Sequence, residues 1–298
     1  MIRAVALALA ATLAFAAPAS RASAPRLELD ARVVWSDPSP GFGGFSGIEV
    51  LDGGARFAAI GDRGVWATGR LLRDAGGRLT GAELEAIGPL HGIDGEALRG
   101  DVADAEGLAV GPDGAFHVSF EHLHRIRRYE SLDAPAGRIP AHPAFDKLQN
   151  NSGLEALAID GDGVIHAIAE RSGRLDRPFP VYRFADGRWL ETLSVPRSGA
   201  WLVTGADFGP DGRLYVLERD FGRFTGFASR IRRYDPGPDG FGAGETLLET
   251  RMVGSTDNFE SISVWRDEQG DTRITLIADD NFFPLQSTAI AEYRLVAD

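Results

Sequence analysis

Hydrophobic and polar positions along the chain follow one pattern that recurs. In its clearest copy, residues 104–121, an acidic residue precedes a short apolar run, an Asp-Gly turn, a second apolar run and a final acidic residue. Two apolar runs joined by Asp-Gly are typical of a β-hairpin. We count five copies, the others being 46–62, 154–170, 205–218 and 259–280.

Further alternating segments follow the hairpins, and we predict them to be strands. The fourth copy, for example, continues into residues 229–234 and 246–250. The Asp-Gly turns that begin at Asp113, Asp162 and Asp211 are spaced by 49 residues. A unit of about four strands that repeats every ~40–50 residues indicates a β-propeller.

The last copy has three strands, of which the third is 288–295, and then the chain stops. An isolated alternating segment at 27–35 has no hairpin partner beside it and can supply the missing strand. We therefore predict an all-β fold, a single β-propeller with five blades whose ring is closed by the N-terminal strand. A sixth blade would require a divergent copy within 69–99, and a β-sandwich would not explain the self-similarity.

Composition and charge narrow the class of partner. The chain has 298 residues, of which 44% are hydrophobic, enough for one large core. Its formal net charge of −12 disfavours nucleic acid and anionic membranes as partners and favours a cation. Cysteine is absent, which excludes thiol nucleophiles, thiolate metal sites and disulfides, and Lys147 is the one lysine available for a Schiff base.

The N-terminal segment has the layout of a secretory signal. Arg3 precedes an apolar run over 4–17, and small residues follow up to Ala24. The run is shorter than the ~18 apolar residues that a membrane span needs. We predict a signal peptide at 1–24, a propeller domain at 25–298, and a monomer that is periplasmic or secreted. The alternative is a frayed hydrophobic N-terminus on a cytoplasmic protein.

Carboxylates occupy equivalent positions in several copies. Glu106, Glu155 and Glu260 stand in the same register at the start of the first strand, where the other two copies have Ser46 and Thr204. The innermost strands of a propeller run beside its central channel. We therefore expect the three glutamates at one mouth of the channel, together with the loops 150–152, 256–258 and 279–281.

The second strands also end in acidic residues. These are Asp62, Glu121, Glu170, Glu218, Asp279 and Asp280. Clustered carboxylates suit a hard cation such as Ca²⁺, which takes about six to eight oxygen ligands. The candidate metal ligands are Glu106, Glu155, Glu260, Asp62, Glu121, Glu170, Asp279 and Asp280. The alternative is that these acids cap turns or pair with Arg63, Arg171 and Arg219, which follow Asp62, Glu170 and Glu218.

Other motifs carry less weight. His122 and His124 would share one face if they lay on a strand, but two histidines without further ligands are a weak metal signal. The patterns G-x-S-x-G, H-E-x-x-H and the P-loop are absent from the sequence. Arginine-rich runs at 125–129 and 230–234 take the same position in two copies, so we interpret them as third strands.

Several segments resemble one family of exported bacterial propellers. They include the pair Asn-Phe-Glu-Ser-Ile and Asp-Asp-Asn-Phe; the segments are 104–108, 151–157, 211–220, 257–262 and 279–282. The chain is similar over nearly its whole mature length to the phytase-like family, "esterase-like activity of phytase". The resemblance implies a propeller with phosphomonoesterase or esterase activity. Calcium-dependent propeller phytases use acidic clusters at the channel mouth, an analogy at the level of the fold.

The sequence thus favours an exported, metal-dependent hydrolase of a small-molecule substrate, of the phosphate-ester type. Glu106, Glu155 and Glu260 would act as metal ligands or base. Arg63, Arg171 or Arg219 would stabilise the developing negative charge. The alternative is a propeller that binds a ligand or partner without catalysis and holds a structural ion.

Overall fold

The structure, a computed structural model, describes residues 24–149, 152–222, 226–250, 258–280, 282 and 286–296. The predicted signal peptide lies outside these ranges apart from Ala24, so it remains a prediction. Within the described ranges, no helix has the length and apolar character that a membrane span requires.

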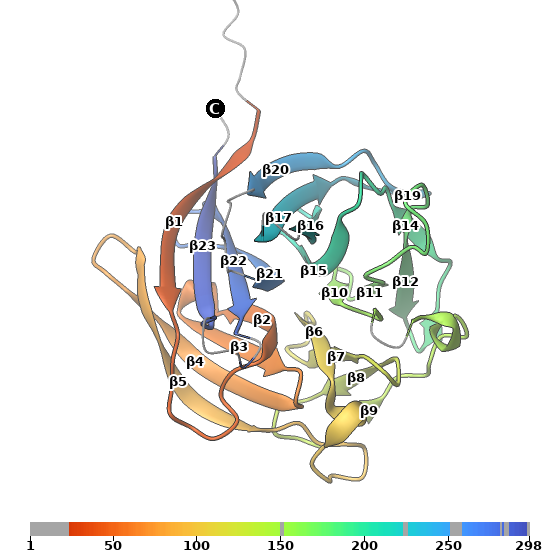
Figure 1. The fold of residues 1–298 in the computed structure, drawn as a ribbon, viewed down its shortest axis with the longest axis horizontal. Helices are drawn as coiled ribbons and strands as arrows, with labels where there is room; N and C mark the ends of the chain where they lie inside the picture. Colours follow the sequence, from red (N-terminus) through yellow and green to blue (C-terminus); the bar gives the residue numbers. More distant parts are fainter. Residues whose placement is uncertain are drawn as a thin grey trace, which may run out of the picture.

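Five antiparallel sheets surround a central axis as the blades of a propeller (Figure 1). From the axis outward, blade 1 is β2 (Phe45–Leu51), β3 (Arg56–Gly61), β4 (Val65–Arg73) and β5 (Leu79–Pro89), and blade 2 is β6 (Ala105–Val110), β7 (Phe116–Phe120), β8 (Arg125–Tyr129) and β9 (Gly137–Arg138). Blade 3 is β10 (Ala156–Ile159), β11 (Ile165–Ile168), β12 (Phe179–Ala185) and β13 (Arg188–Trp189), with β14 (Leu193–Val195) also pairing with β12. Blade 4 is β15 (Leu202–Phe208), β16 (Leu214–Gly222), β17 (Gly226–Tyr234) and β20 (Glu245–Thr250), and blade 5 is β21 (Asn258–Arg266), β22 (Thr272–Asp279), β23 (Ala289–Val296) and β1 (Arg26–Val34).

The ring closes through the first strand of the chain. β1 pairs antiparallel with β23, from Arg26 opposite Val296 to Val34 opposite Ala289. Just beyond β1, the backbone N–H of Trp35 donates to the carbonyl of Thr288 at 3.0 Å. The prediction that an N-terminal strand completes the last blade is confirmed, and Figure 1 shows β1 alongside β23.

The two strands predicted after the first hairpin belong to blade 1. β4 pairs with β3, and β5 pairs with β4. In the stretch that follows, an isolated bridge between His91 and Ala97 precedes the next blade. The alternative of a sixth, divergent blade within 69–99 is therefore wrong, and the count of five is confirmed.

The core lies between neighbouring blades, and the inner strands of a blade are covered on both faces, as the nearly continuous burial along β2, β3, β10 and β11 shows. Where β1 joins blade 1, the Trp35 ring stacks on Phe45 at a centroid distance of 4.8 Å and meets Phe57 edge-on at 4.9 Å. These three side chains are almost fully buried. They attach the closing strand to the first blade.

The hairpin turns use glycine for a backbone reason. In the turn of blade 2, the N–H of Gly114 donates to the carbonyl of Gly111 at 2.8 Å, and Gly114 has φ 81°. That left-handed conformation is costly for a residue with a Cβ. Gly163 and Gly212 take the same conformation in blades 3 and 4, which explains the recurring Asp-Gly signal.

Candidate functional site

The residues predicted at the channel mouth lie at irregularities of the innermost strands. In blades 1, 2, 4 and 5 the pairing between the first and second strands shifts register, and the shift falls at Ser46, Glu106, Thr204 and Glu260. In blade 3, Glu155 directly precedes β10. A β-bulge turns a side chain out of its regular alternation. The bulges thus redirect the equivalent residues of four blades.

Small residues next to these positions let the inner strands approach closely. A Cβ added to Gly107 would lie 2.9 Å from the backbone nitrogen of Leu157 in blade 3. A Cβ at Gly205 would lie 3.2 Å from the carbonyl oxygen of Glu260 in blade 5. Because a side chain at either position would push the blades apart, these glycines help to bring the glutamates of different blades together.

An acidic cavity of about 230 Å³ occupies this mouth of the channel. Among the described residues, eight carboxylates and one guanidinium line it, together with Gly44 and Ser46; the charged residues are Asp62, Asp104, Glu106, Glu121, Glu155, Glu170, Glu260, Asp279 and Arg219. The three glutamates expected around one opening, Glu106, Glu155 and Glu260, all line it. The acids come from four of the five blades, so ring closure assembles the cavity.

Three of these acids are close enough to share one ion. Glu106, Glu121 and Glu155 each offer a carboxylate oxygen, and these oxygens lie within 4.8 Å of one another. Oxygen ligands of one Ca²⁺ lie ~2.3–2.6 Å from the ion, so two of them can be up to ~5 Å apart. The donor set therefore fits a hard divalent cation.

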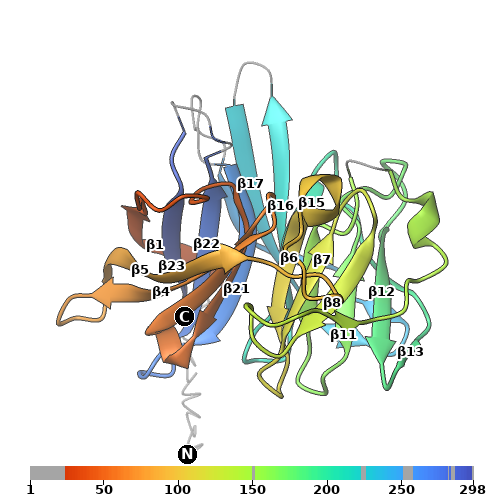
Figure 2. The same cartoon turned by 90° about the horizontal axis from the view of Figure 1, so that it is seen from below.

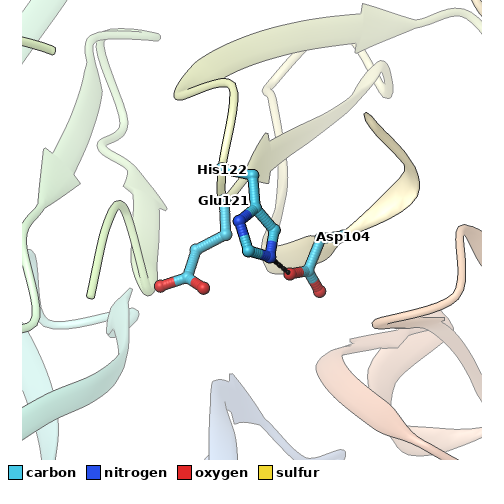
Figure 3. A group of neighbouring side chains, drawn as sticks. All are labelled: Asp104, Glu121 and His122. Carbon is cyan, nitrogen blue, oxygen red and sulfur yellow. Dashed lines mark ion pairs between the residues drawn. The ribbon is translucent and has the colours of Figure 1, made fainter. Parts of the chain in front are cut away.

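A second group of possible ligands shares Glu121 with the first. Atoms of Asp104, Glu121 and His122 also lie within 4.8 Å of one another. Figure 3 shows His122 directed at Asp104, and the His122 Nε2 lies 3.1 Å from the Asp104 Oδ2. Glu121 is buried, whereas His122 is exposed. His122 lines a neighbouring hollow, which shares Asp62 and Asp104 with the acidic cavity.

The idea that His122 and His124 share a strand face is wrong. Residues 121–124 form a turn between β7 and β8, and His122 has φ 51°. The His124 Nε2 instead lies 3.1 Å from the carbonyl of Gln149. The tight turn therefore separates the two histidines and gives only His122 to the cavity rim.

Burial and neighbouring negative charge raise the pKa of several acids in the cavity. The pKa of Glu106 is well above its usual value because of burial and then the charges of Asp104 and Glu121. The pKa of Glu155 is likewise raised by burial, then by Glu106 and Glu170. Burial and the charge of Asp104 raise the pKa of Asp62 to about 6. A bound cation would remove this electrostatic cost.

Glu260 has a different environment from the other two glutamates. Its carboxylate accepts hydrogen bonds from the Arg219 guanidinium and from the Asn258 amide. The same guanidinium donates to the Asn258 Oδ1 at 2.8 Å and lies 3.7 Å from the Glu170 Oε1. Burial raises the pKa of Glu260 to about 7 despite the opposing effect of Arg219. Glu260 is thus ion-paired inside the cavity.

The other two predicted arginines lie outside the cavity lining. Arg171 donates to Glu170 at 2.9 Å and to the Ser152 Oγ at 2.8 Å, and it is half exposed. The Arg63 guanidinium lies over the Phe282 ring, 3.4 Å from its centroid. It lines an adjoining hollow with Asp62, Asp104 and His122. Arg219 is the predicted arginine that faces the acids directly.

Two neighbouring acids of blade 5 have separate roles. Asp279 lines the cavity. The Asp280 carboxylate instead accepts hydrogen bonds from the backbone N–H groups of Gly44 at 3.1 Å and Phe282 at 3.0 Å. Asp280 therefore fixes the loop at the start of blade 1 to blade 5, as the turn-capping alternative anticipates.

Sequence reasoning gave no role to Asp104, little weight to His122 as a metal ligand, and placed Asn258 at this mouth only as part of a loop. In the structure Asp104 lines the cavity, His122 pairs with Asp104, and Asn258 donates a hydrogen bond to Glu260. Asp104 was visible as the first acid of the clearest repeat, two residues before Glu106. Of the loops expected at this mouth, residues 150, 151, 256, 257 and 281 lie outside the described residues.

The family assignment agrees with this geometry. The phytase-like family, described as "esterase-like activity of phytase", matches residues 40–282, so the chain belongs to this family. No curated protein matches.

Solved structures match the chain at low similarity. The PQQ-bound aldose sugar dehydrogenase of Streptomyces coelicolor has 13% identity, with 92% of this chain and 99% of that chain covered, and a TM-score of 0.49. A gluconolactonase from Xanthomonas campestris has 14% identity, with 80% and 68% covered, and a TM-score of 0.42. These values carry no inference about activity.

Proposed function

We propose that the protein is a metal-dependent hydrolase of small phosphate esters that acts at the acidic cavity. The observation that carries this proposal is the imbalance of charge: eight carboxylates face one guanidinium, and oxygens of Glu106, Glu121 and Glu155 lie within 4.8 Å of one another. Without a cation, burial and mutual repulsion of the carboxylates destabilise the folded protein. A bound cation would offset this cost, and carboxylate oxygens are the ligands that a hard cation prefers.

Glu106, Glu121 and Glu155 would hold the cation, with Ca²⁺ the first candidate because every ligand is a carboxylate oxygen. When bound, a divalent cation supplies Lewis-acid stabilisation of negative charge on ester oxygens. Glu121 is fixed for this role because its Oε1 accepts the N–H of Gly153 in the next blade at 2.8 Å.

Arg219 would contact the anionic part of the substrate. Among the described residues that line the cavity it is the single cation. Glu260 and Asn258 hold its guanidinium in place, so little side-chain freedom would be lost on binding. At about 230 Å³ the cavity has room for a phosphate group but not for a large leaving group. The alcohol part of the ester would lie at the rim, beside His122.

The direct test is release of phosphate from an aryl phosphate and from phytate, each with calcium, after chelation, and with calcium restored. We expect turnover that chelation abolishes and calcium restores. An aryl carboxylic ester assayed in parallel distinguishes phosphatase from carboxylesterase activity. No turnover of any of the three esters under any condition would refute the hydrolase.

A second candidate is a non-catalytic propeller in which the ion is structural. The Glu121–Gly153 hydrogen bond joins blades 2 and 3, and the Ser46 hydroxyl donates to the carbonyl of Ala105, which joins blades 1 and 2. An ion held by Glu106 and Glu155 would reinforce the contact between blades 2 and 3. Glu106→Gln and Glu155→Gln discriminate: large losses of Tm without any measurable turnover in the wild type favour this role.

We further propose that residues 1–24 direct export to the periplasm or medium and that the mature protein acts as a monomer. Support comes from the charged, apolar and small-residue order of the segment. N-terminal sequencing of the protein recovered from the periplasm should begin close to residue 25. Recovery of an intact Met1 from the cytoplasm would contradict export.

A further inference from the structure

A second and larger cavity lies at the opposite end of the blades. Its volume is about 780 Å³, and its lining includes Val110, Ile159 and Phe208, the last residues of β6, β10 and β15. The acidic cavity is lined at the other end of β6 and β10, by Glu106 and Glu155. Strands of four to seven residues at ~3.3 Å per residue separate the two by about 10 to 20 Å. This second cavity, the turn-side pocket, is independent of the acidic one.

Four blades carry an arginine at the same position of the third strand. Arg128, Arg183, Arg233 and Arg294 pair across the sheet with His117, His166, Tyr215 and Arg273, respectively. In each blade the carbonyl of one turn residue accepts the backbone hydrogen bond that spans the hairpin turn, and the partner of the arginine lies two residues further along the chain. These turn residues are Ala115, Val164, Arg213 and Asp271. The four arginines are therefore equivalent, and their surroundings can be compared directly.

Three of these arginines contact carboxylates. Arg128 lies 2.9 Å from the Asp113 Oδ2, Arg233 lies 2.7 Å from the Glu245 Oε2, and Arg294 lies 3.8 Å from the Glu28 Oε2. Arg183 differs: among the described residues no carboxylate pairs with it, and its Nε is buried without a hydrogen-bond partner. Its half-buried side chain lines the turn-side pocket.

The local sequence explains why Arg183 has no acid beside it. The turn carboxylate of blade 3, Asp160, lies 3.0 Å from the His166 Nε2 and accepts the N–H of Val164 at 2.9 Å. The fourth strand, which supplies Glu245 in blade 4 and Glu28 in blade 5, is here Arg188–Trp189 and contains no acid. Asp162, the other acid that lines the pocket, is exposed. Arg183 therefore differs from the three equivalent arginines, each of which has a carboxylate within 4.0 Å.

Part of the lining of this pocket is apolar. Phe208, Phe241 and Leu193 line the pocket, and the His166 ring meets the Phe208 ring edge-on at 4.9 Å. The volume is within the ~300–1,000 Å³ typical of small-molecule sites, which combine apolar walls with a few polar groups. A guanidinium presents paired donors that match carboxylate and phosphate oxygens.

We propose that the turn-side pocket binds a small organic anion whose carboxylate or phosphate contacts Arg183 and whose ring or hydrocarbon body packs on Phe208 and Phe241. The anion would supply the partner that Asp113 and Glu245 supply to the equivalent arginines. The site is distinct from the acidic cavity, so the proposal does not depend on hydrolase activity.

The test is calorimetric titration of the purified protein with 2-naphthoate, 2-naphthylphosphonate and the neutral 2-naphthamide. We expect saturable binding of at least one of the two anions with a Kd of about 1 mM or below, and at least ~10-fold weaker binding of the amide. The stronger of the two anions identifies the preferred head group.

Two variants complete the test. Arg183→Gln should weaken binding of the anion at least ~10-fold with an unchanged Tm, because this arginine has no ion pair to lose. Arg128→Gln, the matched control in blade 2, should leave binding unchanged. Equal binding to wild type and Arg183→Gln, equal loss in both variants, or the absence of saturation with either anion would overturn the proposal.

Discussion

The two ends of the central channel differ although the same repeated hairpin builds both. At the strand starts, carboxylates from four blades face one another and a single guanidinium. At the turn end, most acids are satisfied locally: Asp113 by Arg128, Asp211 by the Tyr215 hydroxyl at 3.1 Å. The side view in Figure 2 shows the strands running from one of these faces to the other.

The difference shows how a repeat acquires a site. Four acids at the turns, Asp113, Asp160, Asp211 and Asp267, find a partner within their own blade. Acids at the strand starts are brought together at the axis by bulges and glycines, and Arg219 is the one cationic side chain among the described residues that line their cavity. We infer that the acidic end is arranged for a cation and that the turn end is arranged for stability, with Arg183 as its exception.

The largest expected effect is on activity at the acidic end. Glu155→Gln should lower kcat/KM for the phosphate ester by about 100-fold or more, because loss of a group that merely orients a metal ligand already costs about 10–100-fold. Steady-state assays at saturating calcium measure this. Asp113→Asn, the matched change at the turn end, should stay within about twofold. Equal losses of kcat/KM in the two variants would contradict the assignment of activity to the acidic end.

Calcium should stabilise the acidic end measurably. At a concentration of ~100 Kd a ligand adds about 2.7 kcal/mol, so chelation should lower the Tm by roughly 5–10 °C. Differential scanning calorimetry with and without chelator checks this. Glu155→Gln should show a much smaller calcium dependence. A chelator-insensitive wild-type Tm would mean that no cation contributes to folding.

A buried carboxyl pair deeper in the channel predicts a dependence of stability on pH. The Glu49 carboxylate accepts the Ser263 hydroxyl at 3.0 Å, and Asp207 accepts the N–H of Val264 at 2.6 Å. Burial raises the pKa of Asp207 to about 7, and burial followed by the charge of Asp207 raises the pKa of Glu49. The folded state therefore holds protons that the unfolded state releases near pH 4.

Stability from this pair should be complete below about pH 4 and should fall as the pH rises to about 7, by a few kcal/mol at most, since one pKa unit corresponds to ~1.4 kcal/mol. Denaturant unfolding from pH 4 to 8 in saturating calcium measures it. Asp207→Asn keeps an acceptor for Val264 and should flatten the curve. An identical slope in the variant would exclude Asp207 as the cause.

The smallest effect is expected at the rim. Arg171 is half exposed where it pairs with Glu170, and exposed pairs contribute only ~0–1 kcal/mol. Arg171→Gln should therefore change the Tm by no more than about 2–3 °C and the activity by less than about threefold. Thermal unfolding and the phosphatase assay test both. A loss of activity as large as that of Glu155→Gln would place Arg171 in the site after all.

Much of the fold could be predicted because β-strands and their turns have recognisable patterns in the sequence. Alternation and the Asp-Gly turns predicted the hairpins, and the strand count predicted closure by the N-terminal segment. The common register of Glu106, Glu155 and Glu260 predicted one shared cavity. Each of these signals is local or repeats, so no knowledge of long-range packing was needed.

The partners of individual charges could not be predicted in the same way. Glu218 and Arg219 are adjacent in sequence, yet neighbouring strand residues point to opposite faces. Glu218 accordingly pairs with Arg230 on the next strand at 2.7 Å, and Arg219 reaches Glu260 in the next blade. The alternation of hydrophobic and polar residues likewise did not predict the bulges or the turn at His122.

The central claim is that Glu106, Glu121 and Glu155 bind a cation. Crystals of the protein grown with Mn²⁺ in place of Ca²⁺ would reveal the ion through its anomalous scattering. We predict a peak among the carboxylate oxygens of these three residues that is absent in Glu155→Gln. Well-ordered glutamates without a peak, or a peak that the substitution leaves unchanged, would contradict the account.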